Sequence, residues 1–323
     1  MNYKFLLIGA NKENSTDGVI VKGIFNILEN VFKNHEKKYL FLEDAIKMTD
    51  NEFFIDEKFD AIFVCGTPWL WDSFQNSTKY DNVYRLFKSH PEAKQIFLGA
   101  GSCMHIESIN SNILKRPDEI QGIKKLYEKA LVISRDKLAH SLFENAGIKS
   151  IFLPCPAYFC YGIDNIKYGT KTENVLIWCD PKLTISANGW SNTEKLNKYY
   201  NTCKYFFVRT RAKVYCALKS EVNSAIKIGI GKPIVLTGYE HTLSVMQKAK
   251  TVLSGRVHCA VPAFVQGCNL GVLQIDSRCH VLKDFNCKII QDQSDLSFIK
   301  RNEIDLKKYF EIYKNNLEKF IIN

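Results

Sequence analysis

Short apolar runs alternate with amphipathic stretches along the first half of the chain. We expect buried strands where these runs are densest, at Phe5–Ile8, Ala61–Val64, Ile96–Leu98, Ala130–Ile133 and Ile151–Leu153. Apolar residues recur at helical spacing over 20–32, and the stretch 117–129 opens with a proline and two acidic residues, as helices often do. Strands that alternate with helices favour a parallel sheet with helices on both faces.

The same alternation starts again after a polar segment at 161–173, which we interpret as a linker. Further strands are expected at 174–179, 204–208, 232–238, 251–253 and 271–275, with helices at 213–228 and 241–250. An amphipathic helix over 304–321 completes the pattern. The sequence therefore predicts an N-terminal α/β domain over 1–162, a C-terminal α/β domain over 163–303 and a C-terminal helix over 304–323.

Composition narrows the class of protein. The chain has 323 residues and a formal net charge of +10, yet its lysines are scattered and form no long basic run. We therefore favour a solvated basic surface, or weak attraction of anionic substrates, over nucleic-acid binding. The 11 cysteines form no C-x-x-C pair and many lie in apolar runs, which is typical of reduced, buried thiols. We expect no metal site and no cofactor.

The sequence also bears on location. No apolar run approaches the roughly 20 residues that a membrane-spanning helix needs. The N-terminal stretch MNYKFLLIG is short and leads directly into polar sequence, so we interpret it as a first strand and not as a signal peptide. We expect a cytoplasmic protein without a transmembrane segment.

Two α/β sheets joined by a linker place a cleft between them, and ligands of such sheets bind beyond the carboxyl ends of the strands. Asn14 and Asp17 follow the first predicted strand without any G-x-G-x-x-G pattern; Asp17 could also be an ordinary helix N-cap. Trp69 and Trp71 lie in CGTPWLWD, which we expect to be a loop. Their rings could stack on a sugar or pack beneath that loop.

The stretch VLSGRVHCAVPAF at 252–264 carries the strongest chemical signal. Arg256 leaves a predicted strand and offers a planar fork suited to phosphate or carboxylate. His258 is expected in the first turn of the following helix, with Pro262 early in that helix. A histidine at that place suits an anion ligand or a proton donor, although a lone histidine is more often a satisfied buried residue. The adjacent arginine favours function.

Two further arginines follow predicted strands. Arg135 precedes Asp136, which we interpret as a helix N-terminal residue, so its guanidinium points to that neighbourhood or to an anion. Arg278 lies in IDSR after a strand and is either a second cation of the same anion site or a surface residue. Three arginines at strand ends are consistent with a ligand that carries several negative charges.

Taken in order along the chain, these motifs resemble the polysaccharide pyruvyl transferase family. The resemblance rests on SGRVH at 254–258, SRDKLAHSLFENAG at 134–147 and NSTD at 14–17, and it runs from about residue 5 to 280. The loops depart from the family pattern. The departures are Thr16 for glycine, GTPW at 66–69 for a glycine-rich turn with Asp72 as its trailing acid, Ala139 for serine, Cys259 for alanine and Arg278 for a late lysine.

The resemblance implies two Rossmann-like domains that face each other across a cleft, as in GT-B glycosyltransferases. It implies transfer of an enolpyruvyl-derived group from phosphoenolpyruvate, the co-substrate, to a sugar hydroxyl of a cell-surface glycan or its precursor, forming a pyruvate ketal. Within that reaction, we assign each candidate residue a hypothetical role. The donor-binding residues would be Arg256, Arg278, Arg135, Ser254 and Gly255, the catalytic residues His258 as acid and Asp17 as base or sugar partner, and the acceptor-binding residues Asn14, Trp69, Trp71 and Asp72.

Two alternatives stay open at this point. One is a nucleotide-sugar glycosyltransferase of the same architecture, which would use arginine and histidine against a diphosphate. The other is a non-catalytic relative that has kept the fold and binds an anionic glycan or metabolite, because fold and function separate easily. Binding of a nucleotide, or binding without turnover, would distinguish them.

Overall fold

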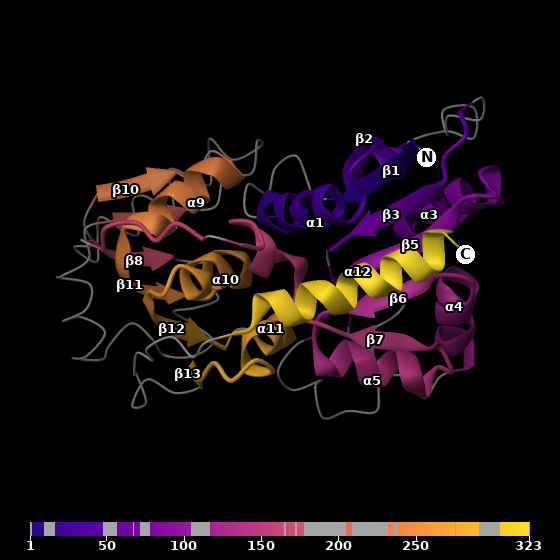
Figure 1. The fold of residues 1–323 in the computed structure, drawn as a ribbon. Helices are drawn as coiled ribbons and strands as arrows, with labels where there is room; N and C mark the ends of the chain where they lie inside the picture. Colours follow the sequence, from indigo (N-terminus) through magenta and orange to yellow (C-terminus); the bar gives the residue numbers. More distant parts are fainter. Residues whose placement is uncertain are drawn as a thin grey trace.

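The computed structural model describes the following residues, and all structural statements below refer to them. They are residues 2–9, 17–47, 57–66, 68–71, 78–104, 117–164, 166–171, 173–177, 205–208, 232–235, 238–274, 276–290 and 304–322. Within this part of the chain, two sheets of parallel strands are each covered by helices, and they define two α/β units that lie side by side (Figure 1).

Within the described residues, the first unit is built on a seven-stranded sheet. Six strands follow the order β2-β1-β3-β5-β6-β7, and β4 pairs with the C-terminal end of β5. Its strands are β1 (Tyr3–Gly9), β2 (His35–Phe41), β3 (Ala61–Cys65), β4 (Pro68–Trp71), β5 (Lys94–Cys103), β6 (Leu131–Ser134) and β7 (Ser150–Phe152). Its helices are α1 (Gly18–Val31), α2 (Leu42–Lys47), α3 (Thr78–Ser89), α4 (Pro117–Tyr127), α5 (Lys137–Asn145) and the 3-10 helix η4 (Pro156–Phe159).

The second unit has a six-stranded sheet with the order β10-β9-β8-β11-β12-β13, again within the described residues. Its strands are β8 (Glu173–Ile177), β9 (Tyr205–Val208), β10 (Lys232–Val235), β11 (Ala249–Ser254), β12 (Asn269–Leu273) and β13 (Ile289–Ile290). Its helices are α9 (Tyr239–Lys248), α10 (Val257–Val265), the 3-10 helix η6 (Ser277–Cys279) and α11 (His280–Lys283); α12 (Leu306–Ile322) follows.

Each sheet reverses its winding direction once, and these switch points are where ligands of doubly wound sheets bind. In the first sheet the chain passes from β1 to β2 on one side and to β3 on the other. In the second it passes from β8 to β9 on one side and later to β11 on the other. Asp17 follows β1 and His258 follows β11, so the two switch points supply these two residues.

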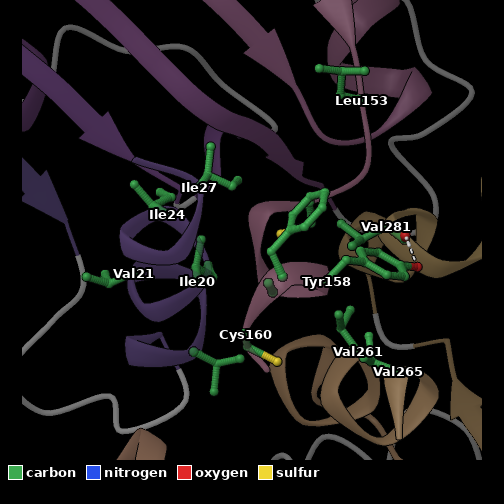
Figure 2. Packing of buried hydrophobic residues seen from close by; sticks show 14 of the residues in the cluster. Ile20, Val21, Ile24, Ile27, Leu153, Tyr158, Cys160, Val261, Val265 and Val281 are labelled. Carbon is green, nitrogen blue, oxygen red and sulfur yellow. Dashed lines mark hydrogen bonds between the residues drawn. The ribbon is translucent and has the colours of Figure 1, made fainter. Parts of the chain in front are cut away.

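A shared apolar core joins the units. Ile20 and Ile24 of α1, Tyr158 of η4, and Val261 and Val265 of α10 belong to one buried cluster and lie close together in Figure 2. Helix α1 approaches η4 very closely because residue 23 is glycine. A Cβ atom there would lie 1.9 Å from the carbonyl oxygen of Pro156. The units are therefore packed through side chains and not merely tethered.

Helix α12 returns from the second unit to the first. It buries one residue per turn against the shared core: Leu306, Phe310, Tyr313, Leu317 and Ile321. The hydroxyl of Tyr313 donates a 2.6 Å hydrogen bond to the carbonyl of Pro154, and its ring meets Phe159 edge to face. Figure 1 shows this helix in yellow, running from beside α11 along the first unit.

Most predicted elements are confirmed within one to four residues of their ends. The helix predicted at 213–228 lies outside the described residues. The prediction that Trp69 and Trp71 lie in a loop is wrong, because residues 68–71 form strand β4, which pairs with Gly101–Cys103 of β5. Pro262 is also deeper in its helix than expected, in the second turn of α10. The domain boundaries stay predictions.

None of the described helices combines the length and apolar character that crossing a bilayer requires.

In the described part of the chain, eight cysteines are buried thiols, and no group of three His, Cys, Asp or Glu residues could hold a metal ion.

Candidate functional site

The turn between β11 and α10 presents His258. Ser254 is fully buried; its hydroxyl donates to the carbonyl of Arg256 and accepts from the amide of the same residue, both at 2.9 Å. This pair of bonds closes the turn over half-buried Gly255 and makes Arg256 the N-cap of α10. His258 then lies in the first turn of the helix, as predicted. The contacts of Ser254 therefore shape the turn.

His258 links residues from the opposite unit. Its Nδ1 lies 3.2 Å from Oδ1 of Asp17, and its Nε2 lies 3.3 Å from Nη1 of Arg135. A guanidinium can only donate, so Nε2 accepts and the ring proton is carried by Nδ1, which donates to the carboxylate. Asp17 occupies the N-cap position of α1 but makes no capping bond with its side chain. Its carboxylate accepts a hydrogen bond from His258 instead.

The surroundings keep His258 neutral. Burial lowers the pKa of His258, and the positive charges of Arg135 and Arg278 lower it further, whereas the hydrogen bond to Asp17 acts in the opposite direction. A buried histidine with both nitrogens partnered fits the purely structural alternative. However, a carboxylate and a guanidinium from another unit are partners that favour a functional role.

The Arg135 side chain is buried against the C-terminal end of β5. It is 0% exposed, and its guanidinium lies over Gly101, where a Cβ atom would come within 2.1 Å of Nε. Nε and Nη2 are buried and have no hydrogen-bond partner among the described residues. Burial raises the pKa of the neighbouring Cys155 thiol, against the charge of Arg135. Arg135 therefore holds unused donor capacity beside His258.

Asp136 has a structural role. Its side chain caps α5 by accepting a 2.7 Å bond from the amide of Ala139, which confirms the predicted position at the start of a helix. It also accepts from the amide and the hydroxyl of Ser102, both at 3.0 Å. Burial raises the pKa of Asp136, and these three bonds oppose that shift.

Arg278 is engaged by its own neighbour. Its Nε lies 2.9 Å from both carboxylate oxygens of Asp276, and its Nη2 contacts the same group. Burial alone would raise the pKa of Asp276, but the bonds from Arg278 and the positive charge of Arg256 hold that pKa below its usual range. Arg256, Asp276 and Arg278 thus form one charged group next to His258.

The structure brings together Asp17, Arg135, Arg256, His258 and Arg278 of the predicted residues. Asn14 and Asp72 lie outside the described residues. Trp69 and Trp71 are described only as backbone positions of β4. Sequence reasoning missed Gly101 beneath the Arg135 guanidinium, Ser102 on the Asp136 carboxylate, and Ser277 between Asp276 and Arg278. A glycine inside a strand was the only signal for any of them.

The fold and site define a two-unit α/β protein of the GT-B type, with charged residues from both units meeting at the sheet ends. The sequence pattern of the polysaccharide pyruvyl transferase family matches residues 11–277. That span covers most of the chain, and the protein belongs to this family. No curated protein is similar enough in sequence to be counted as a relative.

Solved structures support the fold. A putative UDP-N-acetylglucosamine 2-epimerase from Listeria monocytogenes superposes with a TM-score of 0.58 at 9% identity, covering 100% of this chain and 89% of the other. The UDP-GlcNAc 2-epimerases from Methanocaldococcus jannaschii and Neisseria meningitidis, both in complex with UDP-GlcNAc, each give 0.54 at 10% identity. These cover 100% and 99% of this chain and 93% of each epimerase chain. At such identities the likeness concerns the fold alone.

Proposed function

We propose that this protein transfers a pyruvyl group from phosphoenolpyruvate to a sugar, forming a cyclic pyruvate ketal and releasing phosphate. The observation that carries the proposal is the contact of Asp17, His258 and Arg135 across the two units, beside Arg256 and Arg278, in a chain of the pyruvyl transferase family. The acceptor would be a glycan or its precursor. Asn14, Trp69, Trp71 and Asp72 remain candidate acceptor contacts.

The reaction defines what the site has to supply. A proton adds to C3 of the enol, two sugar hydroxyls form bonds to C2, and the C2–O bond to phosphate breaks. The two sugar hydroxyls release two protons. One completes the new methyl group at C3, and the other ends on the departing phosphate. The donor carries a phosphate and a carboxylate, so arginine guanidiniums are suited to binding it.

His258 is the proposed acid, and its geometry couples protonation to donor binding. Negative charge placed against Arg256 and His258 raises the pKa of His258 from its depressed value, so the ring takes up a proton. Protonation at Nε2 removes the lone pair that accepts from Arg135. Arg135 then needs a new acceptor, which a donor oxygen supplies.

Asp17 is best placed to orient His258. Its carboxylate holds Nδ1–H and fixes which nitrogen faces the donor. The contact with the imidazole supports this orienting role, and the roles expected from the sequence, a base for the sugar hydroxyl or a sugar partner, stay predictions. A general acid held in this way is typically worth about 10²–10⁴-fold in rate.

The test is calorimetric titration of phosphoenolpyruvate, with UDP and CMP in parallel, on the native protein and on Arg256→Ala. We expect phosphoenolpyruvate to bind the native protein and Arg256→Ala to lose it. Arg85→Ala is the matched control, because Arg85 lies exposed on α3, away from the site. Binding of a nucleotide without binding of phosphoenolpyruvate would identify a glycosyltransferase, and binding without phosphate release across an acceptor panel would identify a non-catalytic relative.

A further inference from the structure

Three buried polar side chains form a connection between the units, separate from the His258 contacts. Ser102 is the second-last residue of β5, Asp136 caps α5, and Ser277 opens η6 in the second unit. All three are 0% exposed. The hydroxyls of Ser102 and Ser277 lie 2.9 Å apart although the residues are 175 positions apart in sequence. Buried polar groups at such a contact are costly unless each is satisfied.

The direction of every bond in this connection follows from the available donors. The amide of Met104 donates to the hydroxyl of Ser277 at 2.8 Å, and the hydroxyl of Ser102 donates to Asp136 at 3.0 Å. Since Ser102 has used its only hydroxyl proton, Ser277 must be the donor in the serine pair. The bonds therefore run in one direction, from Met104 through both serines to the Asp136 carboxylate, and each of the two hydroxyls has its partners.

The backbone reinforces the same connection. The amide of Ser277 donates to the carbonyl of Met104 at 2.9 Å, so Met104 and Ser277 exchange two bonds. Nearby, the amide of Lys137 donates to Asp284 at 2.6 Å. Tyr158 donates to the carbonyl of Val281 at 3.0 Å, the dashed line in Figure 2.

The location of these groups connects them to the charged residues. Asp136 follows Arg135 directly, and Ser277 lies between Asp276 and Arg278. The serine pair thus fixes the backbone positions from which Arg135 and Arg278 project, one from each unit. A change in the serine contact would change the separation of these two guanidiniums.

We propose that Ser102 and Ser277 form a permanent clasp between the units, which positions Arg135 and Arg278 so that the anion site is assembled before the donor arrives. The clasp stays closed during binding and turnover. Ser102 and Ser277 are therefore positioning residues, which act through the arginines. The identity of the anion rests on the proposed function, whereas the clasp itself does not.

The test replaces the clasp by a covalent bond. In Ser102→Cys/Ser277→Cys, two thiols occupy hydroxyl positions 2.9 Å apart, close enough to join as a disulfide with modest adjustment. We expect hydrogen peroxide, which is small enough to reach buried thiols, to oxidise them to a disulfide, as read by peptide mass spectrometry. The crosslinked protein should bind phosphoenolpyruvate within about threefold of the native protein, since a closed clasp is already the binding state. The reduced form of the same protein is the matched control.

Two outcomes overturn the proposal. If no crosslink forms while the variant keeps its unfolding temperature, the serines do not stay in contact. If the crosslink forms and abolishes binding that reduction restores, the units must separate to admit the ligand. Should the native protein fail to bind phosphoenolpyruvate, the proposed function fails, and the clasp is still decided by small-angle scattering. The crosslinked variant and the native protein must then have equal radii of gyration, and a larger radius for the native protein refutes the clasp.

The positioning role has its own measurement. Ser277→Ala should weaken binding of phosphoenolpyruvate roughly tenfold, as loss of a buried hydrogen bond can. It should also move the NMR titration of His258, because Arg135 shifts relative to the imidazole. Ser150→Ala is the control, since it removes a buried serine hydroxyl bonded to His140 at the opposite end of the first sheet. A His258 titration identical in both variants would show that the serine acts on stability alone.

Discussion

At the scale of single residues, the site depends on how His258 is protonated. Its imidazole is buried between a carboxylate on one side and a guanidinium on the other. Burial first, and the positive charges nearby second, lower its pKa and keep it neutral. The proton on Nδ1 faces Asp17, so Nε2 is the nitrogen that can change state when an anion arrives. The two predictions at this scale test the lowered pKa of His258 and the orientation of its ring by the Asp17 carboxylate.

The first prediction concerns pH and stability. The pKa of His258 is lower in the folded protein than its ordinary value of 6.5, so the unfolded chain takes up this proton first as the pH falls. The stability contribution is complete above pH 6.5, declines below it, and levels off below the folded pKa. The difference in unfolding free energy between native protein and His258→Gln should therefore shrink between pH 7.5 and pH 5 in urea titrations. A difference that grows in acid would contradict the lowered pKa.

The second prediction concerns Asp17. In Asp17→Asn the neutral amide can still accept from Nδ1–H but no longer stabilises a charged imidazolium. We expect binding of phosphoenolpyruvate to weaken, because it is coupled to protonation of His258, and phosphate release to fall further, by at least about 10²-fold. Steady-state assays that separate kcat from KM provide the measurement. A selective rise in the KM of the acceptor would favour the alternative role of Asp17 as a sugar contact.

At the scale of elements, dense apolar runs were enough to predict the central strands. Strand β3 (AIFVC) is entirely buried and was found from its sequence alone. Strand β2 (HEKKYLF) was missed because it lies at the sheet edge, where four polar or charged residues precede its apolar end. The serine clasp was missed for another reason: it joins residues 175 positions apart, and no local pattern encodes such a contact. Arg256 and His258 were found because both follow the same buried strand.

The third prediction concerns β5, which carries Gly101 beneath Arg135. A methyl group at residue 101 would lie 2.1 Å from Nε, so Gly101→Ala must displace the guanidinium. We expect a loss of anion binding as large as in Arg135→Ala, with a stability cost of about 1–3 kcal/mol from overpacking. Calorimetry and thermal unfolding report the two effects separately. Unchanged phosphoenolpyruvate affinity in Gly101→Ala would remove Arg135 from the donor site.

At the scale of the whole molecule, the two units share one apolar core. The cluster that contains Phe5 and Ile24 of the first unit also contains Val252 and Leu270 of the second and Leu317 of α12. A core of this kind couples the units energetically, because neither can lose its packing without exposing the surface of the other. Unfolding should accordingly involve both units together.

The fourth prediction tests this coupling. Leu317 is 0% exposed, and Leu317→Ala should destabilise the protein by about 2–5 kcal/mol. Hydrogen exchange in β1 and in β11 should accelerate equally, since both strands pack on the shared core. Tyr309→Leu, on a partly buried position of the same helix, is the milder control. Accelerated exchange confined to the first sheet would show that the units unfold independently.

The return of α12 to the first unit has a consequence for synthesis on the ribosome. The strands of the first sheet leave the exit tunnel long before residues 306–322, which supply Tyr313 for the carbonyl of Pro154 and Leu317 for the core. Until then the nascent chain displays an unfilled apolar seam along α1 and η4. Chaperones recognise such surfaces on unfinished domains. A message truncated before residue 306 would therefore yield a chain held by chaperones or degraded, even though both of its sheets had been translated.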